Sequence, residues 1–209
     1  MKKMLVYLFG LFVLALGVSF SAKSNLGLSA VSALPYALGF IWGVSFGVAT
    51  VLTHFVYVGS QIFILGKQFK MRYLLQIVFG MLFGTFIDLT SNLLSFESPN
   101  LYVYRLLLQF TSISLIAIGL FFVIVPHIVD STAEGFIRSI SIRFNLDFGK
   151  VKFIHDIITA SSALILGLVF LPEIVIVREG TILSALLVGP ILGLLIKKFK
   201  KRVEAFYIT

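Results

Sequence analysis

The chain has 209 residues, of which 59% are hydrophobic and 12% are charged, and its mean hydropathy is +1.07. Soluble globular domains carry about 25% charged residues, so this composition excludes a water-soluble fold. The net charge of +8 raises the question of a nucleic-acid partner, and the absence of cysteine excludes disulfides and thiolate metal sites.

Apolar stretches predict the membrane-crossing helices in chain order. Each is about as long as the 20 residues that a bilayer requires. We expect a single, all-α polytopic membrane domain over residues 1–209 that ends in a basic tail, 197–209. The six predicted spans are residues 4–22, 44–65, 73–94, 102–125, 151–171 and 179–196.

Two segments, 23–43 and 127–145, are too polar for an ordinary span and too apolar for a solvated loop. We expect each to form a short helix that either re-enters the membrane or lies at its surface. Broken elements at membrane depth are tolerated only against protein or a wet cavity. Pro35 disfavours the α conformation at Leu34. The candidate gating residues are Asn25, Pro35, Pro126 and Glu134.

Positive charge falls mainly on one predicted side of the membrane. With the N-terminus inside, all but three of the 17 Lys and Arg residues lie in inside segments. Because positive residues mark the cytoplasmic side, we predict that both termini are cytoplasmic. Orientation and contact with anionic lipid of the bilayer then explain the net charge, and no nucleic acid is required. The three exceptions are Lys23, Arg105 and Arg178.

The two halves of the chain repeat the same order of elements. A gapless shift of 102 positions places Gly17 on Gly119, Ser29 on Ser131 and Gly47 on Gly149. Few residues are identical, so the shared order of span, half-polar segment, span and glycine-bearing span is the better evidence. Because each unit has three spans, the second must be inverted. We predict two inverted three-helix repeats, 4–94 and 102–196, an arrangement that recurs in secondary transporters.

Ionisable side chains inside a membrane are costly and usually face protein or water. His54, near the middle of its span, is either a proton carrier or a neutral imidazole bonded to a serine or carbonyl. Asp156 either serves the same site or pairs with Lys152 one turn away. His127 and His155 lie near the inner interface, where solvated histidines are ordinary.

Asp88 and Asn92 lie one turn apart near the outer end of the third span, which suits either a solute vestibule or a helix cap. The candidate ligand-binding or proton-relay residues are therefore His54, Asp88, Asn92 and Asp156. No metal, cofactor or enzyme activity is predicted, because metalloprotease, nucleophile-elbow, Walker and dinucleotide motifs are absent. Gly80 and Gly84 form a GxxxG pair through which a homodimer could pack.

Four stretches resemble the YczE/YyaS/YitT family of bacterial integral membrane proteins. They are ALG at 15–17, AKSNLGLSAVSALP at 22–35, FGKVKFIHD at 148–156 and GTILSALLVGPI at 180–191. The resemblance implies a six-span protein of the bacterial plasma membrane with no settled biochemical activity.

The predicted function is transport of a small solute by alternating access of the inverted repeats. The alternative is a non-transporting binding or accessory subunit, such as a solute-capture component that needs an energising partner. The intramembrane ionisable residues favour transport.

Overall fold

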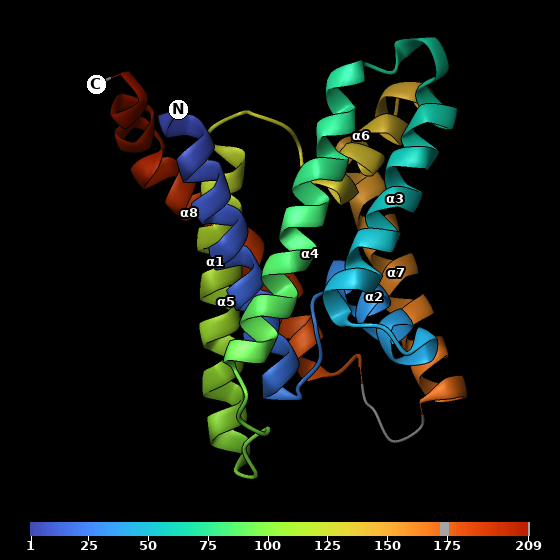
Figure 1. Ribbon diagram of the computed structural model, residues 1–209, viewed down its shortest axis with the longest axis vertical. Helices are drawn as coiled ribbons and strands as arrows, with labels where there is room; N and C mark the ends of the chain where they lie inside the picture. The colour runs from blue at the N-terminus through green and yellow to red at the C-terminus, as the bar shows by residue number, and fades with distance from the viewer. Residues whose placement is uncertain (172–175, 209) are drawn as a thin grey trace.

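The computed structural model describes residues 1–171 and 176–208, and all regular structure in these residues is helical (Figure 1). Within these residues, six helices are long and apolar enough to cross a membrane, which confirms the predicted all-α membrane fold with six spans. They are α1 (Lys2–Ser24), α3 (Phe46–Leu65), α4 (Leu75–Leu93), α5 (Tyr102–Ile124), α7 (Phe148–Phe170) and α8 (Glu179–Ile208). Two shorter helices are α2 (Ala30–Trp42) and α6 (Thr132–Phe144), and two 3-10 turns, η1 (Gly66–Gln68) and η2 (Met71–Leu74), join α3 to α4.

One boundary differs from that expected from the sequence, and one proline lies within a helix. α8 continues through the predicted basic tail, because Lys, Arg, Glu and Ala are good helix formers and Lys200 pairs with Glu204 one turn on (3.7 Å). Pro35 lies inside α2, and Leu34 before it is helical although the proline disfavours that conformation. α2 packs against both α3 and α7, and burial of the Pro35 ring offsets the lost backbone hydrogen bond.

The short helices α2 and α6 enter the bundle from opposite ends (Figure 1). Both pack against α3 and α7. α2 ends at Gly43 and α6 ends at Asn145, each in the left-handed conformation that turns the chain sharply (φ 64° and 52°). α3 and α7 then begin at once, with Ser45 and Asp147 as N-caps. The half-polar segments are therefore helices packed within the bundle.

The most extensive helix pair is α1 with α5, which run in opposite directions (Figure 1). A Cβ on Gly17 would lie 2.8 Å from the Ile116 backbone nitrogen, and one on Gly119 would lie 2.5 Å from that of Leu14. Ser112 Oγ donates to the Gly17 carbonyl oxygen (2.7 Å). The two backbones approach this closely because glycine has no side chain.

We sort the eight described helices into two groups of four, and α4, which packs against both α1 and α3, connects them. α1, α4, α5 and α8 form the α1 group, and α2, α3, α6 and α7 form the α3 group. α4 joins the groups mainly by packing against α3, whereas α7 and α8 do not pack as a pair in the described residues. In Figure 1, α7 and α8 lie on opposite sides of the molecule.

Glycines bring α3 and α4 into contact. A Cβ on Gly47 would overlap the Gly84 carbonyl, and one on Gly80 would lie 2.6 Å from His54 Nδ1. The GxxxG face of α4 is therefore occupied by α3 of the same chain. A homodimer stays a prediction, but Gly80 and Gly84 already face α3 within the chain.

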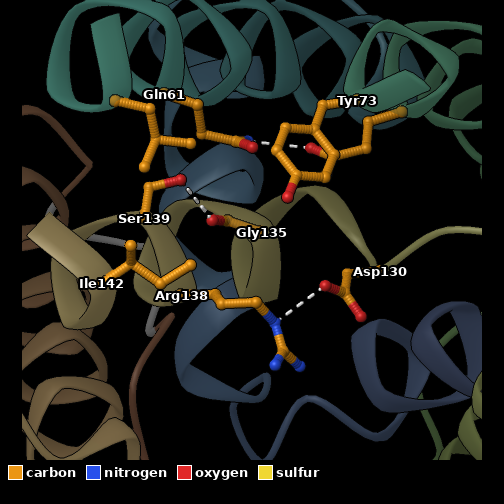
Figure 2. Close-up of a pocket in the computed structure, with 9 residues that line it drawn as sticks. Gln61, Tyr73, Asp130, Gly135, Arg138, Ser139 and Ile142 are labelled. Atoms are coloured by element: carbon orange, nitrogen blue, oxygen red, sulfur yellow. Dashed lines mark hydrogen bonds and ion pairs between the residues drawn. The ribbon is translucent and has the colours of Figure 1, made fainter. Parts of the chain in front are cut away.

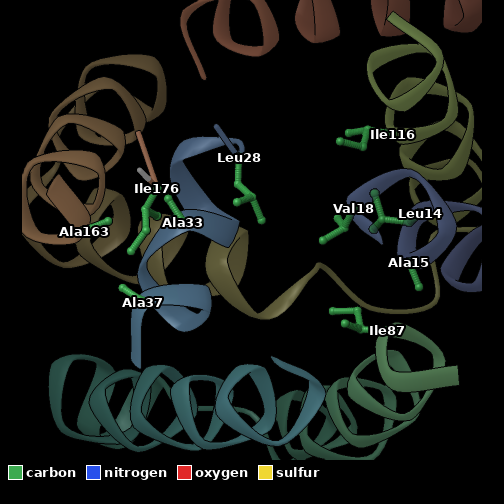
Figure 3. Close-up of a cluster of buried hydrophobic side chains, with 10 residues drawn as sticks. All are labelled: Leu14, Ala15, Val18, Leu28, Ala33, Ala37, Ile87, Ile116, Ala163 and Ile176. Atoms are coloured by element: carbon green, nitrogen blue, oxygen red, sulfur yellow. The ribbon is translucent and has the colours of Figure 1, made fainter. Parts of the chain in front are cut away.

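Buried apolar side chains from both groups form one cluster (Figure 3). α2 contributes Ala33 and Ala37, which are fully buried, and α7 contributes Ala163. Such small residues allow the short helix to pack closely against a span. The other members are Leu14, Ala15 and Val18 of α1, Ile87 of α4, Ile116 of α5, and Leu28 and Ile176 of the connections.

The first turns of α8 are tied to α1 and α5 by the side-chain amide of Gln109, which is fully buried. Its Nε2 donates to the Gly180 carbonyl and to Ser184 Oγ, both at 3.0 Å. Its Oε1 accepts from Ser24 Oγ at 2.8 Å and from Ser21 Oγ at 3.3 Å. Every polar atom of this amide is thus paired, as a buried group requires.

The last turns of α8 are tied to α1 as well. Lys2 Nζ lies 5.3 Å from the centre of the Phe206 ring, and Lys3 Nζ lies 5.6 Å from that of Tyr207, both within cation–π range. Between the two ends, α8 contains Pro190. A Cβ on the adjacent Gly189 would meet no described atom within 4 Å.

The α1–α5 contact predicts a strong difference between two glycine substitutions. Gly119→Ala forces a methyl into the Leu14 backbone and should destabilise the protein by about 1–3 kcal/mol. Gly189→Ala is the matched control, since its methyl enters open space and alanine favours a helix. Thermal unfolding of both purified variants measures the effect; equal unfolding temperatures would contradict the close contact.

Candidate functional site

A pocket lies between α2, α3 and α4, where the two helix groups meet; we call it the His54 pocket. The first half of α2 forms one wall, the middle of α3 a second, and α4 the third. The lining residues are Val31, Ser32 and Pro35 of α2, Thr50, Thr53, His54 and Tyr57 of α3, and Phe83 and Ile87 of α4.

Hydrogen-bond acceptors are available on two walls of this pocket. Pro35 has no N–H, so the Val31 carbonyl one turn earlier lacks its helical donor. Thr50 and Thr53 each donate their hydroxyl proton to a carbonyl of α3, at 2.8 Å and 2.9 Å. Their oxygens retain lone pairs that can accept. The pocket therefore combines apolar side chains with a few polar groups, as small-molecule sites do.

His54 is held between α3 and α4. Its ring stacks on Phe83 with centroids 6.1 Å apart and planes 12° apart. Its Nδ1 is buried, faces Gly80, and has no hydrogen-bond partner among the described residues. The serine or carbonyl partner that the sequence analysis considered is therefore not seen for Nδ1. An unpaired buried polar atom is costly, and such exceptions call for an explanation.

Tyr57 connects the pocket to α7. Its hydroxyl lies 3.0 Å from His155 Nε2, and its ring stacks on Phe136 of α6 at 5.1 Å. His155 is only 7% exposed, so the solvated histidine expected at this position is wrong. The physical reason is that α7 buries one stripe, which includes Val151 and Thr159, against the short helices.

Asp156 forms the predicted pair with its neighbour one turn earlier. Lys152 Nζ lies 3.0 Å from Asp156 Oδ2, which confirms the i,i+4 ion pair. Asp156 Oδ1 lies 3.4 Å from His155 Nδ1. Asp156 does not line the His54 pocket, but it is linked to it through His155 and Tyr57.

Asp88 caps α3 from the neighbouring helix. Its Oδ1 accepts the Gly47 backbone N–H at 2.7 Å, and its Oδ2 accepts the Ser45 hydroxyl at 2.6 Å. A carboxylate at a helix N-terminus satisfies unpaired donors and suits the helix dipole. Of the two predicted roles, the geometry is that of a cap. Asn92, one turn further along α4, is exposed.

The four candidate gating residues lie at both ends of the bundle. Asn25 ends α1 in the left-handed conformation, and its carbonyl accepts from Arg178 Nη1 at 3.1 Å. Pro35 lines the His54 pocket, and Pro126 is buried just after α5. Glu134 lies in the first turn of α6. The structure therefore does not gather these four side chains at one gate.

A second pocket, the Gln61 pocket, lies where α6 meets α3 and η2 (Figure 2). Gln61 Nε2 donates to Gln76 Oε1 at 2.8 Å, and both side chains are almost fully buried. On the open side, Arg138 Nε lies 2.8 Å from Asp130 Oδ2. The other lining residues are Leu65, Tyr73, Gly135, Ser139 and Ile142.

Glu134 is partly buried in the first turn of α6 and lines neither pocket. Its backbone N–H donates to Ser131 Oγ at the start of α6 (3.4 Å). Burial raises the pKa of the Glu134 carboxyl above its ordinary value, although Lys152 opposes the change. The sequence marked Glu134 only as a gating residue.

Tyr57 is the residue that sequence reasoning missed. It carries no charge, so a search for ionisable groups in a span passes over it. The available signal was its position three residues after His54, because residues so spaced share one face of a helix.

The family model of DUF6198, described as a family of unknown function, matches residues 1–197. The chain therefore belongs to this family. No curated protein and no solved structure matches it. The family description does not mention YczE, YyaS or YitT proteins, so that resemblance stays a prediction.

The cap geometry predicts the effect of removing the Asp88 carboxylate. Asp88→Ala leaves the Gly47 N–H and the Ser45 hydroxyl without their acceptor, and should destabilise the protein by about 1–3 kcal/mol. Ligand binding in the His54 pocket should persist. Asn92→Ala, at the exposed position, should change stability by less than about 0.5 kcal/mol. A stable Asp88→Ala protein that no longer binds ligand would instead make Asp88 a binding residue.

Burial of Glu134 predicts a pH-dependent gain from its neutral analogue. Since the folded-state pKa is raised, the stability that the neutral carboxyl contributes is present at low pH and is lost as pH rises through that value. Glu134→Gln should therefore unfold at increasingly higher temperature than the parent protein as pH rises. Glu97→Gln, at an exposed loop position, is the control. A difference that shrinks with rising pH would contradict the burial.

Proposed function

We propose that this membrane-spanning protein is a secondary transporter that carries a small solute through the His54 pocket by alternating access of two inverted repeats. The observation that carries the proposal is the position of that pocket, between the α1 group and the α3 group at their α3–α4 contact. Each group contains helices of both repeats, and a site between two such groups lies where movement of one group against the other would give alternating access.

The contacts between α1 and α5 support an inverted repeat. Gly17 meets Ile116, and Gly119 meets Leu14. A shift of 102 positions places Gly17 on Gly119 and Leu14 on Ile116, so the two contacts involve corresponding residues in reversed roles. A contact that is reciprocal in this way is the property of two units related by a two-fold axis.

The backbone at the helix ends follows the same shift. Asn25 and His127, which follow α1 and α5, both have φ 52°. α2 and α6 begin and end at positions that differ by 102, and so do the first residues of α3 and α7. Corresponding helices run in opposite directions (Figure 1). These features support the boundaries 4–94 and 102–196 for the two units.

The two units are packed differently at one place. In the first, α3 packs against α4 through glycines, whereas the corresponding α7 and α8 are not a packed pair in the described residues. In the alternative state, α7 would pack against α8 and α3 would separate from α4. The α3–α4 contact, on which the His54 pocket lies, would then be open. This change of packing is the motion that alternating access requires.

The orientation follows from the distribution of charge. Both termini lie at the same end of the bundle as the basic η1–η2 connection (Figure 1). Positive residues at this end support a cytoplasmic location for both termini in a bacterial plasma membrane. A second copy or a partner subunit stays a prediction.

A thermal-shift screen of the purified full chain against metabolites, vitamins and ions tests the pocket. A ligand at 100 times its dissociation constant should stabilise the protein by about 2.7 kcal/mol. His54→Asn should weaken the binding at least tenfold. His127→Asn is the matched control, because His127 is exposed and asparagine accepts its left-handed backbone.

Flux then separates transport from capture. A ligand found in the screen should cross the membrane of liposomes that contain this protein alone. Binding without flux would favour the solute-capture subunit, and a ligand whose binding ignores His54→Asn would place the site elsewhere.

A further inference from the structure

The second half of the bundle carries a cluster of ionisable side chains where the first half carries the His54 pocket. We call Glu134 of α6 and Lys152, His155 and Asp156 of α7 the Glu134 cluster. A shift of 102 positions places these four residues on Ser32, Thr50, Thr53 and His54, all of which line the pocket. None of the four cluster residues lines the His54 pocket, so the cluster calls for a separate explanation.

A continuous series of polar contacts joins the cluster to the pocket. It begins at Lys152, which is partly exposed, and passes through Asp156 to His155 and Tyr57. Because His155 Nδ1 faces a carboxylate, that nitrogen carries the proton in the neutral ring. His155 Nε2 then accepts the hydroxyl proton of Tyr57. The series thus ends on Tyr57, one of the residues that line the pocket.

The surroundings of the cluster are set by the helices packed on it. Glu134 lies within electrostatic range of Asp130, Arg138 and Lys152, and also of Tyr7 of α1. His155 meets the Tyr57 hydroxyl of α3 and the Phe136 ring of α6. α2, which also packs against α7, contributes no acidic or basic side chain.

Lys152 serves two carboxyl groups. It pairs with Asp156 at 3.0 Å and also attracts Glu134. Burial favours the neutral form of Glu134. When Glu134 is ionised, the two carboxylates compete for one ammonium group, and Asp156 is left to stabilise a proton on His155.

We infer that the Glu134 cluster is a proton-binding site whose occupancy alters the His54 pocket through the His155–Tyr57 hydrogen bond. The inference rests on the proposed transport function and makes the proton the coupling ion. When His155 binds a proton at Nε2, that N–H donates to the Tyr57 oxygen. The Tyr57 hydroxyl proton is then released from His155 and turns towards the pocket, where it donates to a solute acceptor.

This change involves no covalent step other than protonation of the imidazole. The proton comes from the aqueous phase at the end of the bundle where Lys152 is exposed. A solute that carries a carbonyl or carboxylate oxygen binds more tightly to the protonated state. Solute and proton therefore bind cooperatively, as symport requires.

The cysteine-free chain allows a direct test. Ser32→Cys places one thiol on the pocket wall, and Ser95→Cys places one at an exposed position. The full chain is reconstituted in lipid nanodiscs, and the reaction rate with a small water-soluble methanethiosulfonate is measured from pH 5 to pH 8. The ratio of the two rates removes most of the reagent's own pH dependence.

We expect this ratio to change several-fold across the titration in the parent background. Glu134→Gln and Tyr57→Phe should each flatten the profile, and Glu97→Gln should leave it unchanged. Tyr57→Phe removes only a hydroxyl. If the Tyr57→Phe protein does not fold, His155→Gln is measured in its place. A flat profile in the parent, or the same profile in Glu134→Gln and Tyr57→Phe, would overturn the inference.

Nitrogen NMR of the three labelled histidines adds a readout that packing alone would not move. The ring-nitrogen signals of His155 should show the proton on Nδ1 in the neutral ring and should change in Glu134→Gln, while those of exposed His127 should not. A pocket that binds solute with a flat pH profile would refute proton coupling only. A pH-dependent pocket that binds nothing in the screen would refute transport and leave the proton site intact.

Discussion

The close crossing of α1 and α5 is the constraint on which the other contacts depend. Lipid provides little hydrophobic force between helices, so association relies on van der Waals packing and buried hydrogen bonds. Gly17 and Gly119 allow the packing, and Ser112 adds a bond to the α1 backbone. With this pair in place, α4 packs on α1 and α8 packs on α5. The α3 group then attaches through the α3–α4 contact, which is where the His54 pocket lies.

Some polar side chains in the bundle bind neighbouring helices, and others keep hydrogen-bonding atoms free for a ligand. Gln109 and Asp88 have their oxygens engaged by neighbouring helices and fix α8 and α3 in place. His54 differs, because its Nδ1 is buried without a partner among the described residues. Among the described residues only one other buried side-chain polar atom lacks a partner, the Tyr207 hydroxyl near the end of α8, and such exceptions call for an explanation. The chemistry of the site is therefore best sought around His54 and Tyr57 beside it.

Sequence reasoning succeeded where the physics is local. The spans follow from length and hydropathy, and the Lys152–Asp156 pair follows from helical spacing. The burial of His155 and the cap formed by Asp88 could not be predicted, because each depends on which face a helix turns to its neighbour. α7 buries His155 only because the stripe that contains Val151, Thr159 and Ala163 packs against the short helices. The sequence does contain that stripe, at four-residue spacing, but nothing in it says which partner it meets.

The attachment of α8 has a consequence for how the second half could change its packing. This helix is fixed at its start by Gln109 and at its end by Lys2 and Lys3. Between these two anchors, a Cβ on Gly189 would meet no described atom within 4 Å, and Pro190 interrupts the backbone hydrogen bonds. Proline and glycine are the residues at which helices bend. The middle of α8 can therefore bow towards α7 with both anchors intact. Curvature of one helix at this point would therefore contribute to an α7–α8 contact without loss of either anchor.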